Sequence, residues 1–576
     1  MIQRRLRLVI SSLLLITTCV LTAALPERTL ASGTEANSLF FEATGHEIRG
    51  SFRAFWERNG GLAVFGYPIS VVFEQDGRET QYFERAVFQA FPDEAEEGYD
   101  VQLVLLGQLL TTNRLQEPAF QPIARGAADA TYFPQTRHQV SGVFRTFWQR
   151  SGGLAIFGYP LSEEFDERNP TDGKTYRVQY FERARFEHHP EHRSTRFEVL
   201  LGQLGSQYTT VHAIPAEVLE RQPGPLPDEL VEIDNPVRIV VNKSFISPLV
   251  ERFGNVAVGH GVFVAGNTIL RADPGHRVCI GNATNLQDNI LFLSLRGVES
   301  PPAECGARST STGEETSIAH QAVVKNSRIG KFTFVGFRAR LENVVLEDGA
   351  FVLHGATLRN VTIGKDRLVP IGATITTQAE ADALPLKTAA NAEFQHEVLE
   401  VNEEFAEGYI ELYEQGGFDA VTGIGPAPTT SFNTGPRPTL GQNIQVEDFA
   451  RIVGDVRLGD NSIVGRRTSI RADEGAPIII GANAEIEDRV TFHALKGTNI
   501  QIGRNLDTDD NVVFHGPLVV GDNLTIEDDA ILFRSTVGDN VTLRTGAIVV
   551  GVTLRDGVTV PDGVVITTQE QADALN

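Results

Sequence analysis

Hydrophobic residues recur every sixth position over the C-terminal quarter of the chain. From Val456 the sequence divides into VRLGDN, SIVGRR, TSIRAD, IIIGAN, AEIEDR, VTFHAL, IQIGRN, LDTDDN, VVFHGP, LVVGDN, LTIEDD and AILFRS. The third position is aliphatic or aromatic in every unit but one, and Gly, Asp and Asn are frequent in the positions that follow it. This pattern predicts short strands joined by tight corners, with three strands making one triangular coil of about 18 residues. We therefore expect a left-handed parallel β-helix, a fold that departs from the usual right-handed crossover.

Two of these hexapeptides place a histidine in the fourth position, His493 and His515. They lie 22 residues apart, and the inserted tetrapeptide KGTN (496–499) leaves 18, one coil. The two imidazoles should then stack at about the strand spacing of 4.8 Å. Two neutral imidazoles so placed can share one zinc ion at about 2.0–2.1 Å each. The alternative is two surface histidines that coincide in phase.

The first third of the chain contains a duplication with a spacing of 92 residues. HEIRGSFRAFWERNGGLAVFGYP (46–68) matches HQVSGVFRTFWQRSGGLAIFGYP (138–160), and both copies continue into QYFERA and LLGQL. Each copy predicts a short amphipathic helix, a glycine turn and a hairpin. The copies loosely resemble LGFP-type repeats of secreted bacterial proteins, which implies contact with the cell envelope or a glycan through Trp and Tyr faces. The alternative is that these aromatic residues form the core.

Length and composition indicate several domains in an exported protein. Arg4, Arg5 and Arg7 precede an apolar run to Leu25, which is the order of an export signal or of an uncleaved anchor. The net charge of −24 argues against nucleic acid or an anionic membrane surface as a partner. Cys279 and Cys305 remain after processing and are able to form a disulfide. The expected divisions are a signal (1–32), two repeats (39–115, 130–207), a linker (208–235), β-helix 1 with a trailing helix (236–415), a linker (416–435) and β-helix 2 (436–576).

The last 140 residues closely resemble gamma-class carbonic anhydrase. The resemblance lies in IRADEGAPIIIG (470–481), IEDRVTFHAL (486–495), VVFHGP (512–517) and the tail GVTLRDGVTVPDGVVITTQEQADAL (551–575). It implies a trimer with zinc between subunits, held by two histidines of one β-helix and a third from its neighbour. His493 and His515 match the pair, whereas Asp510 stands where the family has the donated histidine.

Residues 236–415 are a second, diverged copy of the same unit. ILRADPGHRVCIG (269–281), NLQDNILFLSL (285–295) and ATITTQAEADALP (373–385) repeat the motifs. Leu293 and Lys325 replace the paired histidines, but His320 retains the donated one. The two copies have therefore lost complementary halves, and His320, His493 and His515 would complete a metal site at an interface between them.

Other family roles are carried over position by position. Glu474 matches an active-site glutamate, Gln287 the glutamine that orients the metal-bound water, and Asn402 an asparagine on the trailing helix. Arg271 with Asp273 and Arg471 with Asp473 match arginine–aspartate pairs across the subunit interface. The inserted loop near 296–315 offers Glu314 and Glu315 as weaker proton carriers.

These observations predict a mainly β protein of two tandem left-handed β-helices behind two small α+β repeats. The resemblance implies hydration of carbon dioxide to bicarbonate by zinc hydroxide, with iron or cobalt as alternative metals, in a pairing within one chain or in a homo-oligomer. One alternative is a non-catalytic surface or adhesion protein on the same fold. A hexapeptide acyltransferase is a weaker alternative, because exported proteins rarely meet acyl-CoA.

Overall fold

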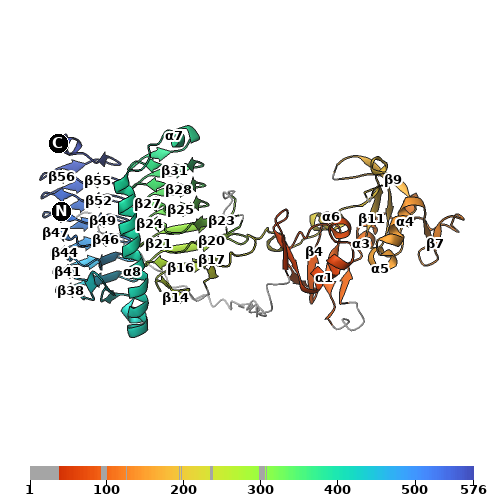
Figure 1. Cartoon of the computed structure of the whole chain (residues 1–576), viewed down its shortest axis with the longest axis horizontal. Coiled ribbons are helices and arrows are strands. Elements are labelled where there is room, and N and C mark those ends of the chain that lie inside the picture. The colour runs from red at the N-terminus through yellow and green to blue at the C-terminus, as the bar shows by residue number, and fades with distance from the viewer. Residues whose placement is uncertain are drawn as a thin grey trace, which may run out of the picture.

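The computed structural model describes residues 38–92, 100–124, 126–170, 172–193, 195, 197–233, 238–297, 305–306 and 308–575. The expected export signal over 1–32 lies outside these residues. Two β-helices stand side by side at one end of the molecule, and a unit built from the two repeats lies beyond the first of them (Figure 1).

The C-terminal β-helix has three parallel sheets that wrap around one apolar core. The seven-stranded sheets run from β38 (Thr439–Leu440) to β56 (Thr553–Leu554) and from β39 (Gln445–Val446) to β57 (Thr559–Val560). The core holds the third-position residues of the hexapeptides. The eight-stranded sheet contains β35 (Ile424–Gly425), β40 (Arg451–Gly454), β43 (Ser469–Ala472), β46 (Thr491–His493), β49 (Val513–His515), β52 (Ile531–Phe533), β55 (Ile548–Val550) and β58 (Val565–Ile566).

The first β-helix is built in the same way around a separate core. One sheet runs from β13 (Val231–Glu232) to β32 (Thr362–Ile363), and another from β16 (Glu251–Phe253) to β34 (Thr374–Ile375) through β19 (Ile269–Ala272), β22 (Leu291–Ser294) and β25 (Val323–Lys325). The third sheet contains β14 (Val240–Val241), β15 (Ser244–Ile246), β18 (Phe263–Val264), β21 (Asn285–Leu286), β24 (Ser317–Ile318), β27 (Phe334–Val335), β30 (Phe351–Val352) and β33 (Leu368–Val369). Fold class is therefore as the hexapeptide pattern predicts.

Asparagine makes one row of corners in the second β-helix. The residues of this row adopt left-handed backbone with φ near +60°, which asparagine tolerates better than most residues. Each side-chain amide donates to the amide oxygen of the next coil, as in Asn483 to Asn505 at 3.0 Å and Asn505 to Asn523 at 2.8 Å. The row therefore satisfies its own polar groups along the length of the coil stack.

The two β-helices meet through the eight-stranded sheet of each. Apolar side chains at this interface form a cluster of their own, including Phe334, Phe337, Ile531 and Phe533. Gly355 permits the close approach, because a Cβ at that position would overlap the side chain of Ile548. Burial of this apolar area favours pairing within the chain.

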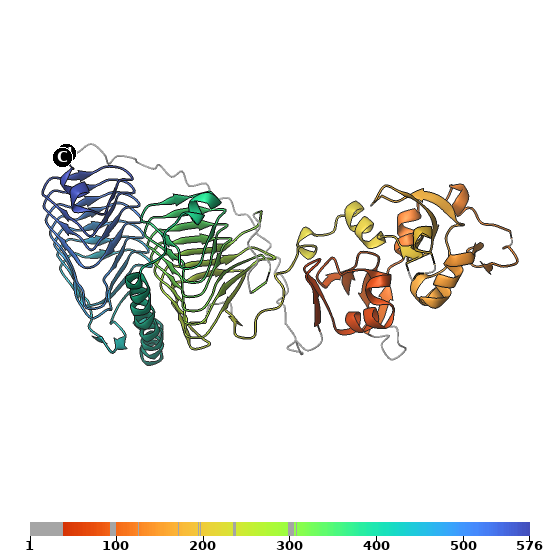
Figure 2. The same cartoon turned by 45° about the horizontal axis from the view of Figure 1, so that its top comes forward.

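A long helix, α8 (Ala389–Ala420), lies along the pair of β-helices (Figures 1 and 2). Thr388 caps its first turn in a capping box with Asn391, and the helix kinks at Gly417. It packs on β15, β18 and β24 of the first β-helix. Its Tyr409 hydroxyl donates to Asp473 of the second at 2.7 Å, so α8 helps to join the two. Each β-helix also ends in a short capped helix, α7 (Gln378–Asp382) and α9 (Gln569–Asp573).

Arg471 makes the central ion pairs of this interface. Its guanidinium lies 2.6 Å from Asp288 of the first β-helix and 2.9 Å from Asp473 of its own, and all three side chains are at least 96% buried. The equivalent pair in the first copy, Arg271 with Asp273, lies elsewhere. Arg271 has a side chain that is 53% exposed, and it does not lie between the two β-helices. The expected interface role of Arg271 and Asp273 is thus not met within this chain, because β19 belongs to the sheet that faces away.

The repeats fold as one intertwined unit. The first contains β1 (Ser38–Phe41), β2 (His46–Arg49), α1 (Gly50–Arg58), α2 (Gly61–Phe65), β3 (Phe73–Gln75), β4 (Arg78–Tyr82), β5 (Val87–Ala90), β6 (Val101–Leu103) and α3 (Leu106–Thr111). The second contains β7 (Thr131–Phe133), β8 (His138–Val140), α4 (Gly142–Arg150), α5 (Gly153–Phe157), β9 (Phe165–Arg168), β10 (Thr175–Tyr180), β11 (Arg185–His188), β12 (Val199–Leu201) and α6 (Leu204–Val211).

Each closing helix begins against the other repeat. The backbone N–H of Gln108 in α3 donates to Glu182, and that of Ser206 in α6 donates to Glu84. Gly107 and Gly205 are required at these contacts, since a Cβ would overlap a backbone carbonyl of the opposite repeat. The two repeats therefore share one aromatic core and cannot be separated without exposing it.

The two tryptophans of the repeats support that core. Trp56 Nε1 donates to the carbonyl of Gly66 at 3.1 Å, and Trp148 Nε1 to that of Gly158 at 3.2 Å. Each indole also meets a phenylalanine edge-to-face, Phe41 and Phe133 respectively. These contacts are those of core residues, the alternative to a binding face for the two tryptophans.

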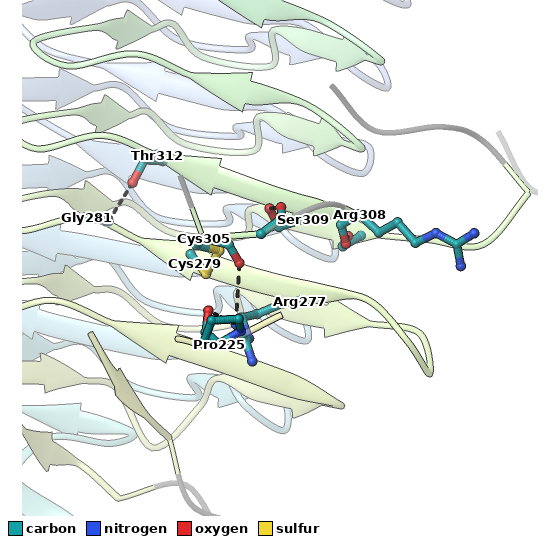
Figure 3. Close-up of a disulfide and its surroundings, with 10 residues drawn as sticks. Pro225, Arg277, Cys279, Gly281, Cys305, Arg308, Ser309 and Thr312 are labelled. Carbon is teal, nitrogen blue, oxygen red and sulfur yellow. Dashed lines mark hydrogen bonds between the residues drawn. A yellow bond between two sulfur atoms is a disulfide. The ribbon is translucent and has the colours of Figure 1, made fainter. Parts of the chain in front are cut away.

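A disulfide joins Cys279 to Cys305 where the first β-helix meets the preceding linker (Figure 3). Arg277 beside it donates to the carbonyls of Pro225 and Cys305. The linker, β20 (Arg277–Ile280) and the start of the segment that follows Cys305 are thereby held together. Among the described residues, no helix has the length and apolar character that crossing a membrane requires.

Replacing Arg471 by methionine should destabilise the paired β-helices by about 3–5 kcal/mol, because two buried carboxylates lose their cation. Both tryptophans lie in the repeats, so tryptophan fluorescence reports their unfolding while far-UV circular dichroism follows the β-helices. We expect urea to unfold the β-helices of Arg471→Met earlier, with the fluorescence transition unmoved. Arg271→Met is the matched control and should change stability by less than about 0.5 kcal/mol. Equal effects of the two variants would contradict this view of the interface.

Candidate metal centre

Three histidines from the two β-helices converge at the interface. The strand register pairs His493 of β46 directly with His515 of β49, as the 18-residue spacing predicts. His320 follows β24 in the facing sheet of the first β-helix. One ring nitrogen of each lies within 4.8 Å of the others, and all three side chains are buried. Among the residues that the structure describes, this is the group of three or more His, Cys, Asp or Glu side chains suited to a metal ion.

Carboxylates hold two of the imidazoles from behind. His320 Nδ1 lies 3.4 Å from Asp288, and His493 Nε2 lies 3.2 Å from Asp473 and 3.3 Å from Glu474. The other nitrogens of these rings, His320 Nε2 and His493 Nδ1, face each other at 3.1 Å. When the ring nitrogen beside the carboxylate carries the proton, the other ring nitrogen keeps its lone pair. This arrangement orients histidine ligands in metal sites.

Burial disfavours the charged form of two of the three imidazoles, those of His320 and His515. It lowers the pKa of His320 to about 4, and burial with the neighbouring histidines holds the pKa of His515 well below its usual range. Burial alone would raise the pKa of Asp288, but Arg471 and His320 hold it well below the ordinary value. At neutral pH His320 and His515 are therefore neutral, and Asp288 and Asp473 are ionised.

An aromatic column fixes the third imidazole. Phe337 stacks on His515 with ring centroids 4.6 Å apart and an interplanar angle of 23°. On the same column His354 stacks on Phe337 at 4.2 Å and 13°, and Phe533 meets His515 edge-on at 5.2 Å. His320, Phe337 and His354 are equivalent positions of successive coils, spaced by 17 residues.

A cavity of about 480 Å³ opens beside the histidines. The three residues assigned by resemblance, Gln287, Asn402 and Glu474, all line it together with His493 and His515. Gln287 Oε1 accepts the backbone N–H of His320 at 3.3 Å, and Asn402 Nδ2 donates to Val398. Burial raises the pKa of Glu474 to about 7. Glu397 and Glu400 of α8 also line this cavity.

Other candidates lie away from the cavity. Leu293 and Lys325 occupy the outward sheet of the first β-helix, where Lys325 pairs with Glu342 at 2.6 Å. Asp510 is exposed on the second β-helix. Glu314 pairs with Lys331, and neither Glu314 nor Glu315 lines the cavity.

Sequence reasoning missed three residues that contact the histidines or their carboxylates. Asp288 follows Gln287 in the motif NLQDN, so the resemblance offered it directly. Phe337 stands at the fifth position of its hexapeptide TFVGFR (333–338), as His320 does in TSIAHQ (316–321), so the 17-residue repeat offered it as a neighbour of the site. Tyr409 carries no motif signal, because its contact with Asp473 depends on how α8 lies across the two β-helices.

The residues present fit a zinc ion. Two nitrogen ligands at about 2.0–2.1 Å from a tetrahedral ion lie about 3.3 Å apart, near the 3.1 Å between His320 Nε2 and His493 Nδ1. Three imidazole ligands leave a fourth position free, which is the pattern of catalytic rather than structural zinc. Iron or cobalt would accept the same ligands.

No family model matches the chain. It is 34% identical over 168 residues to the carboxysome assembly protein CcmM of Nostoc sp., covering 29% of this chain and 30% of that protein. It thus spans about a third of that relative's length. It is 31% identical over 119 residues to gamma carbonic anhydrase 1, mitochondrial, of Arabidopsis thaliana, covering 20% of this chain and 42% of that one.

A solved hexapeptide transferase family protein from Anaplasma phagocytophilum is 18% identical with a TM-score of 0.17, covering 28% of this chain and 91% of that one. The match to the carbonic anhydrase of Methanosarcina thermophila is more informative, at 33% identity over 180 residues, or 29% of this chain and 73% of that enzyme. Since the chain spans most of that enzyme and also matches a gamma-class relative, it belongs to the gamma carbonic anhydrase family.

Proposed function

We propose that this chain is an exported carbonic anhydrase that hydrates carbon dioxide to bicarbonate at one metal site between its two β-helices. The observation that carries the proposal is the meeting of His320 with His493 and His515, because each copy alone lacks part of the ligand set. A homo-oligomer is not needed to complete such a site, since both halves belong to one chain.

His320, His493 and His515 would hold zinc, which makes hydroxide available at neutral pH by lowering the pKa of water to about 7. Asp288 and Asp473 keep the imidazoles of His320 and His493 oriented. Gln287 and Asn402 offer amide groups along the cavity wall. Glu474 is the carboxylate of the cavity that contacts His493, and we assign it the proton released by the reaction.

A second candidate is a non-catalytic assembly protein on the same fold. The observation that favours it is the match to CcmM, whose name describes assembly, together with the replacement of ligands at Leu293, Lys325 and Asp510. Export rests on the order of basic and apolar residues at the N-terminus, outside the described residues. An envelope or glycan contact of the repeats also belongs to the proposal.

After reconstitution with zinc, the purified chain should hold about one zinc ion and hydrate carbon dioxide. His320→Ala and His493→Ala should each reduce zinc to near zero and activity to the uncatalysed rate. His276→Ala is the matched control, because His276 is a buried histidine of the first β-helix that contacts Ser294 instead of the site. Elemental analysis with stopped-flow hydration assays measures both quantities. A parent protein that folds but binds no zinc would overturn the proposed enzyme function and favour the assembly protein.

Mixing His320→Ala chains with His493→Ala chains tests whether the site lies within one chain. Both intact halves are present in the mixture, but on different molecules. If the halves pair only within a chain, refolding the two together should restore no zinc and no activity. Recovery of about a quarter or more of the parent's zinc would show that the histidines are shared between chains.

Loss of the stacked ring beside His515 should weaken metal binding without abolishing it. We expect Phe337→Leu to raise the dissociation constant for zinc by about three- to tenfold, as aromatic pairs contribute about 0.5–1.5 kcal/mol. Competition with a chromophoric chelator measures the constant. Phe351→Leu serves as control, since Phe351 is equally buried but stacks on Phe334. Equal weakening by both variants would place the effect in general packing of the interface.

A further inference from the structure

A recess lies far from the metal centre, in the unit formed by the repeats. It has a volume of about 950 Å³ and lies where the ends of α1 and α4 approach β12. Its wall carries three guanidinium groups, from Arg58, Arg85 and Arg150. None of the described residues that line it is acidic, although the whole chain has a net charge of −24.

The duplication supplies two of these arginines from equivalent positions. Arg58 ends α1 and Arg150 ends α4, and each is followed by a polar residue and a glycine with positive φ. A cation at a helix C-terminus is favourable in itself, so either arginine alone would need no ligand. Their meeting in one cleft, with Arg85 between the repeats, is not explained by the two helix ends.

The side chains of Arg58 and Arg150 make no hydrogen bond or ion pair to any described residue. Arg85 differs, since its Nη1 donates to the carbonyls of Leu62 and Ala63 at 2.7 and 3.2 Å. One guanidinium is therefore fixed by the backbone, and two others are available to a ligand. A concave surface lined by cations and without anions concentrates anionic ligands.

Apolar side chains make up much of the remaining wall. Phe147 lines the cleft, and Leu62 and Phe197, also in its wall, are 40% and 45% exposed. A cleft of this volume is larger than an inorganic anion requires and is typical of sites for organic ligands. Guanidinium groups match the fork geometry of phosphate and carboxylate. The ligand therefore needs both an anionic group and an apolar body.

We propose that this cleft binds an organic phosphate or carboxylate with an apolar body, held by Arg58, Arg85 and Arg150. The site is separate from carbonic anhydrase chemistry and does not rest on the zinc centre. It also differs from adhesion through Trp and Tyr faces, because Trp56 and Trp148 donate to backbone carbonyls inside the repeats.

1-Naphthyl phosphate tests the proposal with the full chain, by isothermal titration calorimetry at low salt. Inorganic phosphate and 1-naphthol are the matched probes that carry only one of the two chemical features. We expect 1-naphthyl phosphate to bind at least about tenfold more tightly than either, and to weaken as salt rises. Equal affinity for 1-naphthol, or no binding up to about 5 mM, would overturn the proposal.

The double variant Arg58→Gln/Arg150→Gln should bind 1-naphthyl phosphate at least about tenfold less tightly. Because neither side chain is bonded within the described protein, the variant should fold, as tryptophan fluorescence would verify. Arg53→Gln/Arg145→Gln is the control at equivalent positions of the same helices, where Arg53 pairs with Glu57 and Arg145 contacts the carbonyl of Asp129. It removes the same charge and should change affinity less than about twofold. A similar loss in both variants, or capture of an acidic peptide but not of 1-naphthyl phosphate, would contradict the assigned site.

Discussion

The guanidinium of Arg471 lies between two buried carboxylates, and each carboxylate orients one histidine of the metal centre. Asp288 faces His320 from the first β-helix, and Asp473 faces His493 from the second. Charges taken out of water stay ionised only where a partner compensates for the lost hydration. The two ion pairs of Arg471 therefore fix both the distance between the β-helices and the direction of the ligand nitrogens. Tyr409 completes the arrangement: burial and Asp473 raise the pKa of its hydroxyl well above the usual range, so it remains a donor.

The candidate metal centre depends on asymmetry between two copies of one unit. The first copy contributes His320, Gln287 and Asn402, and the second contributes His493, His515 and Glu474. The three histidines converge, and the other three residues line the cavity beside them. In an assembly of identical subunits every copy would need all of them. Fusion of two copies relaxes that requirement, because a fixed partner within the chain sets which face of each β-helix is covered. The N-terminal unit shows the same principle, since α3 and α6 each complete the opposite repeat.

Much of this arrangement was readable from sequence because the hexapeptide has a fixed geometry. One apolar residue in six gives the β-helix, and setting aside the four-residue insertion leaves His493 and His515 one coil apart. The limit is shown by Arg271 and Arg471, which stand in the same RAD motif but end in opposite environments, one 53% exposed and the other 4%. Local sequence fixes which side chains point outward, but pairing of whole β-helices decides which outward face is buried. The role of Phe337 depends on the same pairing, since its outward-pointing ring stacks on His515 only when the two β-helices meet.

The positions that lost their histidines follow from this geometry. Lys325 is 30% exposed in its side chain and pairs with Glu342, and Asp510 is exposed on the other β-helix. A histidine at either position would meet water and no second ligand within this chain, so metal binding would not stabilise it. A charged residue there is hydrated at little cost and keeps an exposed sheet from associating with others. At the covered faces the reverse holds, because His320, His493 and His515 are desolvated and a charged replacement would be buried without a partner. The distribution of kept and lost histidines is thus what pairing within the chain would maintain.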